Sequence, residues 1–450
     1  MLKEAWTLAI ESLSWMEMQK LSERLALAKT VRQLGIGDAD AVRLAHMLVC
    51  ETVRRRNFID AFINNVLKPK TISEFDLGVQ AFLRLYVYQT RIARDWSKID
   101  VKEAENIAKT ARAILGWKSL KKVEPFLGAL LTQDPQVAFD GLGDEERVAL
   151  LTFHPTWFVK YCFRLFGRVE AIKILEANLQ APPTYIRLNT LRASEETILG
   201  ELEKEGVKVE KVKELKYAYK VLAAQKPLTH IESFQKGLFY IQDKASCFAA
   251  EAANPQPNMV VLDVCAAPGA KTTYLAQLMQ NRGAIYSIDY SKRRIGIWKS
   301  EINRMGVKIA TPIIADACNL PPLKLEADIV ILDPPCTSTG AFAKLPSAKW
   351  RLTRRSVEKM AEIQWQMLCS CVDNVKPGGK LVYSTCSITT EENEMLIERF
   401  LKWYPEFSLV DVEPEMGLHG LRGLEKCRRL YPHLHSCNGF FIAKMLKGKS

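Results

Sequence analysis

VVLDVCAAPGAK, residues 260–271, decides the fold of this chain of 450 residues. An apolar strand that carries Asp263 near its end runs into a turn of small residues, and a helix is expected at Thr272–Gln280. Small residues let a ligand approach the backbone closely, and the first turn of a helix offers free N–H groups. The stretch lacks the GxGxxG and Walker spacings, so it indicates a nucleoside-type ligand, with a plain tight turn as the alternative. The candidate ligand-binding residues are Cys265, Ala266, Ala267, Pro268, Gly269, Ala270 and Lys271.

Strands and helices alternate regularly downstream of this stretch. Strands are expected at Ala284–Asp289, Ile309–Ala315, Ala327–Leu332 and Gly379–Ser384, and helices at Lys292–Met305 and Ser356–Asn374. Such alternation is typical of a mostly parallel sheet with helices on both faces, which binds ligands at the carboxyl ends of its strands. The sequence therefore predicts an α/β, Rossmann-like domain over residues 246–450.

Acidic residues end the next two strands. Asp289 stands twenty residues after Gly269, where an acid commonly accepts hydrogen bonds from ribose hydroxyls. A helix cap is the alternative, although Ser291 can provide that cap instead. Asp316 follows the third strand and fits a contact to an adenine amino group, again with a cap as the alternative. Arg294 is either a further cofactor contact or a solvated arginine, and together these strand ends point to S-adenosylmethionine (AdoMet).

Two cysteines follow the ends of later strands. Asp333-Pro334-Pro335-Cys336 ends the fourth strand, and its two prolines stiffen the loop that presents the cysteine. Cys386 stands in YSTCSITTEENE, and a helix is expected to begin near Thr390. A buried structural thiol is the default interpretation of a single cysteine. Two cysteines at the carboxyl ends of parallel strands instead favour a functional pair.

A thiol has a specific use beside a methyl donor. Cytosine C5 is too weak a nucleophile to attack a sulfonium methyl group, but addition of a thiolate at C6 makes C5 enamine-like. A carboxylic acid at N3 would stabilise the charge that develops there, and Asp333 is placed for that role. A second thiol near C5 would assist release of the product. The pair therefore predicts methyl transfer to C5 of cytosine.

The composition fits a globular protein with a polyanionic partner. Sixty-three Lys and Arg residues against 51 Asp and Glu give a net charge of +12, and clustered basic residues favour nucleic acid. The apolar runs are strand-sized and the N-terminus lacks a signal-peptide core, so a soluble cytoplasmic protein without a membrane partner is expected. The eleven cysteines include no CxxC pair, which argues against a disulfide framework and against a zinc site.

The chain upstream of the Rossmann-like domain divides into two parts. Residues 1–165 are expected to form an all-helical domain, in which Asp38–Leu67 has helical spacing with a basic break at Arg54–Arg56. The break is either a solvated helix end or a phosphate-contacting patch. Residues 166–245 combine helices such as Ser194–Glu205 with strand-like stretches, which predicts a small α+β module.

These motifs resemble, in their order, the RsmB/Sun (Fmu) family of AdoMet-dependent RNA cytosine-5 methyltransferases. The resemblance rests on DVCAAPGAK, the Asp289 strand end, Asp316, DPPCTSTG and YSTCS, with GLFYIQDKASCF ahead of them and Gly439-Phe440-Phe441 after them. It implies that Cys386 is the nucleophile and that Cys336 assists product release. The presence of both thiols argues for RNA rather than DNA.

The N-terminal part is similar to the NusB-like domain of bacterial rRNA members of the family, on AVRLAHMLVCETVRRRNFIDAFINNVL and FLRLYVYQT. This similarity implies that the helical and α+β domains grip RNA, and it favours rRNA over tRNA as the substrate of a monomeric enzyme. Ala270 departs from the family, which commonly has a second glycine there, so the turn must keep φ negative at this residue. The alternative function is a ribosome-assembly factor that binds RNA with a vestigial methyltransferase domain. Intact Cys386, Cys336, Asp333 and Lys271 argue against it.

Overall fold

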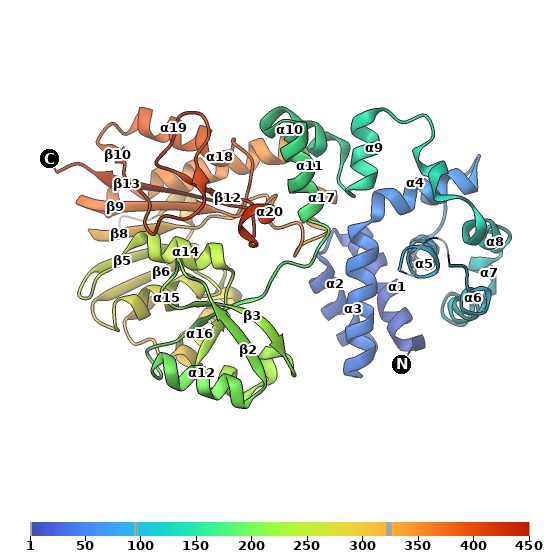
Figure 1. Cartoon of the computed structure of the whole chain (residues 1–450), viewed down its shortest axis with the longest axis horizontal. Coiled ribbons are helices and arrows are strands. Elements are labelled where there is room, and N and C mark those ends of the chain that lie inside the picture. Colours follow the sequence, from blue (N-terminus) through green and yellow to red (C-terminus); the bar gives the residue numbers. More distant parts are fainter. Residues whose placement is uncertain (1, 94–95, 97, 321–325, 450) are drawn as a thin grey trace. The chain divides into compact units, whose positions relative to one another are not determined.

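The computed structural model describes residues 2–93, 96, 98–320 and 326–449. The chain divides into two compact units (Figure 1). The helical unit comprises Met1–Gln180 and Phe342–Leu352, and the sheet unit comprises Ala181–Ala341 and Thr353–Ser450. None of the helices in the described part of the chain combines the length and apolar character needed to cross a membrane.

The helical unit is built around buried side chains such as Trp6, Phe62 and Phe82. Its helices are α1 (Leu2–Gln19), α2 (Glu23–Leu34), α3 (Ala39–Arg54), α4 (Arg56–Leu67), α5 (Leu77–Val87), α6 (Val101–Leu115), α7 (Trp117–Leu120), α8 (Glu124–Thr132), α9 (Asp144–Leu151), α10 (Thr156–Phe166), α11 (Arg168–Ala177) and α17 (Ala348–Arg351). The predicted break between two helices falls at Arg55, which ends α3 and precedes α4.

The three arginines at this break do not form a solvated helix end. Arg54 is buried and donates hydrogen bonds to the backbone oxygens of Asn178 and Ala343, each at 3.0 Å. Arg55 forms an ion pair with Glu51. The solvated interpretation is therefore wrong for Arg54, because a buried guanidinium needs acceptors and finds them on two distant segments of the same unit.

The segment Phe342–Leu352 belongs to the helical unit although its neighbours in the chain belong to the sheet unit. Phe342 packs edge-on against Phe158, with ring centroids 5.2 Å apart. The Trp350 indole N–H donates to the backbone oxygen of Val53 at 2.6 Å. An apolar ring at one end and a satisfied indole near the other fix this segment on the helices.

The sheet unit begins with a small antiparallel sheet. Its strands are β1 (Tyr185–Leu188), β2 (Val207–Lys211), β3 (Ala218–Ala224) and β4 (Phe239–Ile241), in the order β2-β3-β1-β4. Helix α12 (Glu195–Lys204) begins after Ser194, whose side chain accepts the N–H of Thr197 as predicted. Ile186, Ile198 and Phe239 form the core of this part.

A nine-stranded sheet forms the rest of the unit. Its strands are β5 (Val260–Val264), β6 (Ala284–Asp289), β7 (Ala310–Ile314), β8 (Ala327–Leu332), β9 (Val375–Thr385), β10 (Phe407–Leu409), β11 (Leu418–His419), β12 (Arg428–Leu430) and β13 (Phe440–Lys447). The order is β11-β12-β13-β9-β8-β5-β6-β7, and β10 pairs with β13. Strands β9, β8, β5, β6 and β7 run parallel, while β13 joins β9 antiparallel. The predicted α/β, Rossmann-like fold is confirmed.

Helices cover both faces of this sheet (Figure 1). They are α14 (Lys244–Ala253), α15 (Ala270–Leu278), α16 (Lys292–Met305), α18 (Arg354–Ser370) and α19 (Glu394–Trp403). Val261 and Ile329 pack with Tyr274 and Trp298 of α15 and α16, whereas the alternate strand residues pack with α18 and α19. The chain runs β5-β6-β7 in one direction and β8-β9 in the other, so the sheet has a switch point between β5 and β8, where ligands bind in such folds.

One predicted helix begins later than expected. Helix α19 starts at Glu394 rather than near Thr390, and Thr390–Asn393 form a turn. The side chain of Glu392 accepts hydrogen bonds from residues on other segments, so this residue is held by tertiary contacts rather than by a helical turn.

Candidate functional site

The parallel strands bring the predicted site residues to one edge of the sheet. Asp263 lies in β5, Asp289 ends β6, Asp333 follows β8, and Cys386 follows β9. These strands are neighbours, and their carboxyl ends meet at the switch point. Acids and a thiol that are far apart in the sequence therefore share one site.

The turn after β5 is shaped for a close approach of the backbone to a ligand. Gly269 has φ of 110°, a conformation that side chains disfavour, and a Cβ there would lie 3.2 Å from Trp298 Cδ1. Ala270 is the first residue of α15 and keeps a negative φ, so the departure from a second glycine leaves the turn intact. The Ala267 N–H donates to Asp289 Oδ2 at 3.3 Å.

Asp289 is buried and points its carboxylate at this turn. Besides the Ala267 N–H, it accepts the Ser291 N–H at 3.1 Å. Ser291, not Asp289, caps α16 by accepting the Arg294 N–H. Arg294 is not merely a solvated arginine, because it forms an ion pair with Asp289 at 3.4 Å and donates to the Ala267 oxygen. These contacts fix the orientation of the Asp289 carboxylate at the end of β6.

Asp316 lies apart from these contacts. It is exposed and caps a short 3-10 helix by accepting the Cys318 N–H at 3.0 Å. The cap that the sequence offered as an alternative is therefore present. An exposed carboxylate oxygen can accept a further hydrogen bond, so the cap does not exclude a contact to a ligand.

Lys271 and Asp333 form an ion pair below the loop that carries Cys336. The Lys271 ammonium donates to Asp333 Oδ2 and lies 3.3 Å from Ser246 Oγ. Burial by itself would lower the pKa of Lys271, but the carboxylates of Asp333 and Asp263 hold it above its ordinary value. The other oxygen of Asp333 accepts the Ser384 hydroxyl at 3.3 Å.

The two thiols face each other. Cys336 Sγ and Cys386 Sγ lie 3.2 Å apart, and Cys386 Sγ lies 3.5 Å from Ser338 Oγ. The contact with Cys336 lowers the pKa of Cys386 against the opposing effect of burial, and Ser338 adds to the lowering. The same contact and burial raise the pKa of Cys336. Of the two sulfurs, Cys386 is therefore the one that loses its proton more readily.

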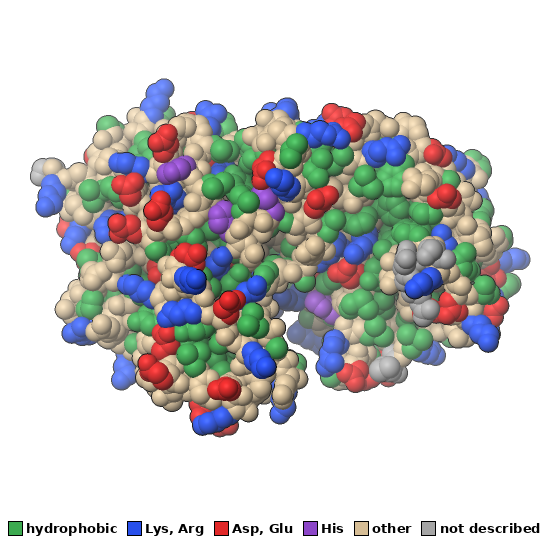
Figure 2. All heavy atoms as spheres, viewed as in Figure 1, with side chains coloured by type: hydrophobic (Ala, Val, Ile, Leu, Met, Phe, Trp, Pro, Cys, Tyr) green, Lys and Arg blue, Asp and Glu red, His purple; other side chains and the backbone are tan. Residues whose placement is uncertain are grey.

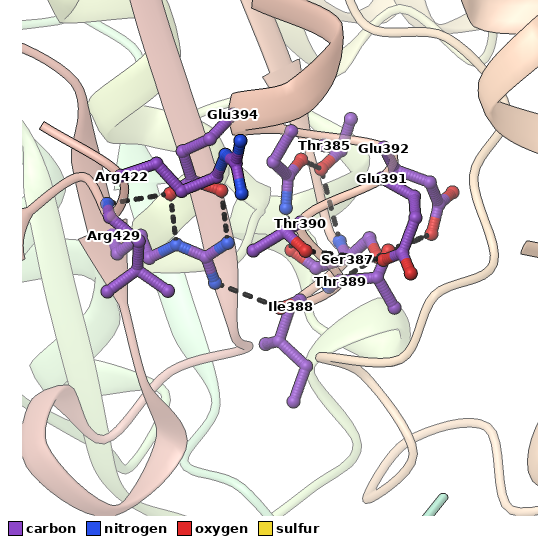
Figure 3. Close-up of polar contacts among 12 residues, drawn as sticks. Thr385, Ser387, Ile388, Thr389, Thr390, Glu391, Glu392, Glu394, Arg422 and Arg429 are labelled. Carbon is purple, nitrogen blue, oxygen red and sulfur yellow. Dashed lines mark hydrogen bonds and ion pairs between the residues drawn. The ribbon is translucent and has the colours of Figure 1, made fainter. Parts of the chain in front are cut away.

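Glu392 connects the two loops that carry these thiols, and Figure 3 shows its place beside Ser387 and Thr389 in the loop after β9. It is completely buried and accepts the Thr337 N–H at 2.8 Å, the Ser387 hydroxyl at 2.5 Å and the Thr389 hydroxyl at 2.8 Å. Gln364 of α18 donates to it at 2.9 Å and also to the Pro335 oxygen at 2.9 Å. One carboxylate thus fixes the loop after β8 to the loop after β9.

Sequence reasoning missed Glu392, because the helix expected to begin near Thr390 would place this residue in its first turn. A signal was available in the five hydroxyl side chains that surround Cys386 and precede the acids in STCSITT. Buried hydroxyl groups need hydrogen-bond acceptors, and a carboxylate close by in the sequence can supply them. The actual donors from Thr337 and Gln364 could not be identified from the sequence.

A second buried pair supports the same region (Figure 3). Arg429 of β12 pairs with Glu394, both of them completely buried, and also donates to the Ile388 oxygen at 2.9 Å. Beside it, a Cβ on Gly340 would lie 2.2 Å from the oxygen of Gly439. The loop after Cys336 therefore needs glycine where it passes the start of β13.

The residues present fit AdoMet as the cofactor. Asp263 is fully buried, and its Oδ1 has no partner among the described residues. A buried oxygen without a donor can take a hydrogen bond from a bound ligand. Carboxylates at the ends of β5, β6 and β8 suit the ribose hydroxyls and the positive charges of AdoMet. Among the described residues, no group of three or more His, Cys, Asp or Glu side chains is placed to hold a metal ion.

Comparisons with known proteins agree with this arrangement. A model of the 16S rRNA methyltransferase RsmB/F family matches residues 250–446. A model of the ferredoxin-like domain of RsmF/B-like methyltransferases matches residues 154–226. The second match spans β1, β2 and β3 of the small antiparallel sheet.

The matched relatives include proteins that align over nearly all of their own length. The probable ribosomal RNA small subunit methyltransferase B of Bacillus subtilis is 30% identical over 453 residues, which cover 98% of each chain. The tRNA (cytosine(72)-C(5))-methyltransferase of Pyrococcus horikoshii is 31% identical over 64% of this chain and 96% of its own. The crystal structure of NSun6 from Pyrococcus horikoshii with SFG, an AdoMet analogue, superposes with a TM-score of 0.60 at 29% identity. It covers 65% of this chain and 97% of that one.

Proposed function

The chain belongs to the RsmB/F family of AdoMet-dependent RNA cytosine-5 methyltransferases, and we propose that it methylates a cytosine of ribosomal RNA through a covalent bond to Cys386. The family and the reaction follow from the matches over the whole chain. The preference for rRNA is supported by the near-complete coverage of the Bacillus subtilis relative in both directions. The covalent route is supported by the pair of thiols at the switch point.

Cys386 acts as the nucleophile in the proposed reaction. Its thiolate adds to C6 of the cytosine, an S–C6 bond forms, and the electrons of the C5–C6 double bond become available at C5. AdoMet, when bound, supplies the methyl group that C5 takes. The depressed pKa of Cys386 favours this role, because the thiolate is the reactive form.

Asp333, held by Lys271, stabilises the negative charge that develops at N3 of the base. Asp333 accepts a hydrogen bond from the Lys271 ammonium, which fixes one of its oxygens and places a positive charge behind it. In its protonated form Asp333 can donate its proton to N3 as the sulfur adds and take it back on elimination. The predicted carboxylic acid at N3 is thus proposed for Asp333, with Lys271 as the residue that positions it.

Cys336 assists product release. After methyl transfer the C5 proton must leave, and its departure restores the double bond while the C6–S bond breaks. Cys336 lies within 3.2 Å of the nucleophile, so a base at this sulfur would be near C5 when Cys386 is bound to C6. Its raised pKa makes it the stronger base of the two once it is ionised.

The cofactor residues are proposed from the strand ends. Asp289 would accept the ribose hydroxyls, and the turn Cys265–Lys271 would approach the cofactor through its backbone. Arg294 would act through its ion pair with Asp289. Asp316 would accept a hydrogen bond from the adenine amino group, because its carboxylate is exposed and able to accept a further hydrogen bond.

The observation that carries the proposed mechanism is the contact between the thiols, and their substitution tests it. Cys386→Ala should abolish both methyl transfer and any covalent RNA adduct. Cys336→Ala should form the adduct through Cys386 but release it slowly, so that methylated RNA migrates with the protein on a denaturing gel. An adduct in Cys386→Ala and none in Cys336→Ala would reverse the two roles.

Bisulfite sequencing of RNA from cells with and without the protein tests the substrate. A cytosine in small-subunit rRNA that loses protection without the protein supports the proposal, whereas loss in tRNA alone would contradict the rRNA assignment. If no cytosine in any RNA loses protection but the purified protein still binds RNA, the alternative of a non-catalytic assembly factor is favoured. The NusB-like identity of the helical unit, its grip on RNA, the monomeric state and the cytoplasmic location remain predictions of the sequence.

A further inference from the structure

We propose that the helical unit carries a pocket for one unpaired nucleotide of the RNA substrate. The pocket has a volume of about 440 Å³, within the range of roughly 300–1,000 Å³ that small-molecule pockets occupy. It lies entirely within the helical unit, between helices α1, α3, α4 and α5 and the segment Phe342–Leu352. The proposal rests on the RNA methyltransferase function, since it assigns part of that enzyme's substrate to a second site.

The lining of the pocket is apolar below and basic at its rim. Leu13, Met16, Leu21, Val53 and Trp350 supply the apolar part. Lys20, Arg56, Arg84 and Arg351 supply the cations, and Glu17 is the acidic lining residue. A nucleotide has the complementary composition, because it joins a flat, weakly polar base to an anionic phosphate.

The cations of the pocket exceed the acids that neutralise them. Glu17 pairs with Arg56 at 2.7 Å and with Arg84 at 3.3 Å. Asp60, behind the pocket, pairs with Arg84 at 2.7 Å. Two carboxylates thus neutralise two guanidinium groups. Lys20 also lies 3.8 Å from Glu17, and Arg351 donates to the Lys20 backbone oxygen at 2.9 Å, so four cations share two carboxylates. The net positive excess lies with Lys20 and Arg351 at the rim, where both are exposed and able to meet a phosphate.

Two further features point to a bound partner. The Thr52 hydroxyl is buried in the lining and has no hydrogen-bond partner among the described residues. Trp350 is only half-buried, and its indole N–H is already satisfied by Val53. The ring can therefore offer a surface to a base without losing a hydrogen bond, and aromatic rings beside cations are typical of single-strand binding.

The face of the molecule in Figure 2 does not provide a simpler explanation for RNA binding. On the face shown in Figure 2, Lys and Arg side chains are interspersed with Asp and Glu rather than gathered in one basic patch. Basic side chains that are interspersed with acids in this way give only weak and nonspecific attraction. A local site that combines surplus cations with apolar surface would hold the strand in one register.

The test uses the full chain and a short single-stranded oligouridylate carrying fluorescein. Lys20→Gln combined with Arg351→Gln should weaken binding by about tenfold and reduce the slope of log K against log[salt] by about 1.4, since each lost phosphate contact with a single strand contributes about 0.7. The matched control is Lys102→Gln combined with Lys109→Gln, which removes two exposed cations of α6 in the same unit. Equal weakening in both double variants would overturn the proposal, because total charge would then explain it.

A second measurement avoids any loss of folding in the variants. The unmodified protein is irradiated with an oligonucleotide that contains 4-thiouridine, and the cross-linked peptides are identified by mass spectrometry. Cross-links at Trp350 or Met16 support the pocket, and cross-links confined to the sheet unit overturn it. Inorganic phosphate that competes as strongly as the oligouridylate would also overturn it, since the site would then bind an anion only.

The outcome for the pocket is separable from the outcome for the function. AdoMet affinity, measured by calorimetry, should be unchanged in Lys20→Gln with Arg351→Gln, while KM for RNA rises and kcat changes little. A protein that methylates RNA normally with both residues replaced refutes the pocket and leaves the methyltransferase function intact. An unmodified protein that never methylates RNA refutes the function, whichever way the binding experiments turn out.

Discussion

Asp263 occupies an uncommon state for a carboxyl group. It is completely buried in β5, the Thr272 hydroxyl donates to its Oδ2 at 2.6 Å, and its Oδ1 has no partner among the described residues. Burial raises the pKa of Asp263 to about 7, although the Thr272 hydrogen bond opposes the rise. Without a ligand, the folded protein therefore prefers the neutral acid.

This state predicts a pH-dependent stability. Between about pH 4 and pH 7 the folded chain keeps a proton on Asp263 that the unfolded chain has lost, so the free energy of unfolding falls as pH rises through this window. Asp263→Asn removes the titration and should stabilise the AdoMet-free protein by up to about 4 kcal/mol at pH 8, with little difference near pH 4. Urea unfolding of both proteins at several pH values measures this. Parallel pH dependences in the two proteins would show that Asp263 is already ionised.

At the scale of elements, the central strands were predictable and the loops after them were only partly so. The expected bounds of β6, β8 and α16 coincide with the observed ones. Buried parallel strands are continuous apolar runs, so their signal is local. The turn before α19 was not predictable, because Glu392 is held by donors from Thr337 and Gln364, far away in the sequence.

Glu392 should matter to catalysis through the two loops that it joins. Glu392→Gln keeps the size of the side chain but replaces an acceptor oxygen by a donor, which leaves one or more buried hydroxyls unsatisfied at about 1–3 kcal/mol each. We expect kcat to fall by at least about tenfold, with the KM for RNA and the affinity for AdoMet nearly unchanged, because the thiols lose their fixed separation.

The pH profile separates this positioning role from general damage. The charge of Glu392 raises the pKa of Cys386, so its removal should move the acidic limb of the rate profile to lower pH. Glu391→Gln is the matched control, because it removes the neighbouring charge without touching the Thr337–Ser387 contacts. A Glu392→Gln enzyme with normal kcat and an unmoved profile would show that the loops hold their geometry without this carboxylate.

At the scale of the whole molecule, the two compact units are not continuous stretches of the sequence. The sequence assigned residues 246–450 to one domain, and most of them do share one compact unit. Phe342–Leu352 instead packs with the helical unit, through contacts such as Phe342 on Phe158. Nothing local marks such a segment, because its partners lie nearly two hundred residues upstream.

Removal of the helical part tests this division. A fragment of residues 181–450 keeps the strands β5, β6 and β8 and all the carboxylates at their ends, so its AdoMet affinity should stay within a factor of about three of the full chain. Its RNA affinity should fall and depend less steeply on salt, because the cations of residues 1–180 are gone.

Phe342 and Trp350 would lose the surfaces that bury them, so the fragment should also self-associate. Phe342→Ser combined with Trp350→Ser should restore a monomer in analytical ultracentrifugation. Loss of AdoMet binding by this restored monomer would mean that the sheet unit depends on the helical unit for its fold.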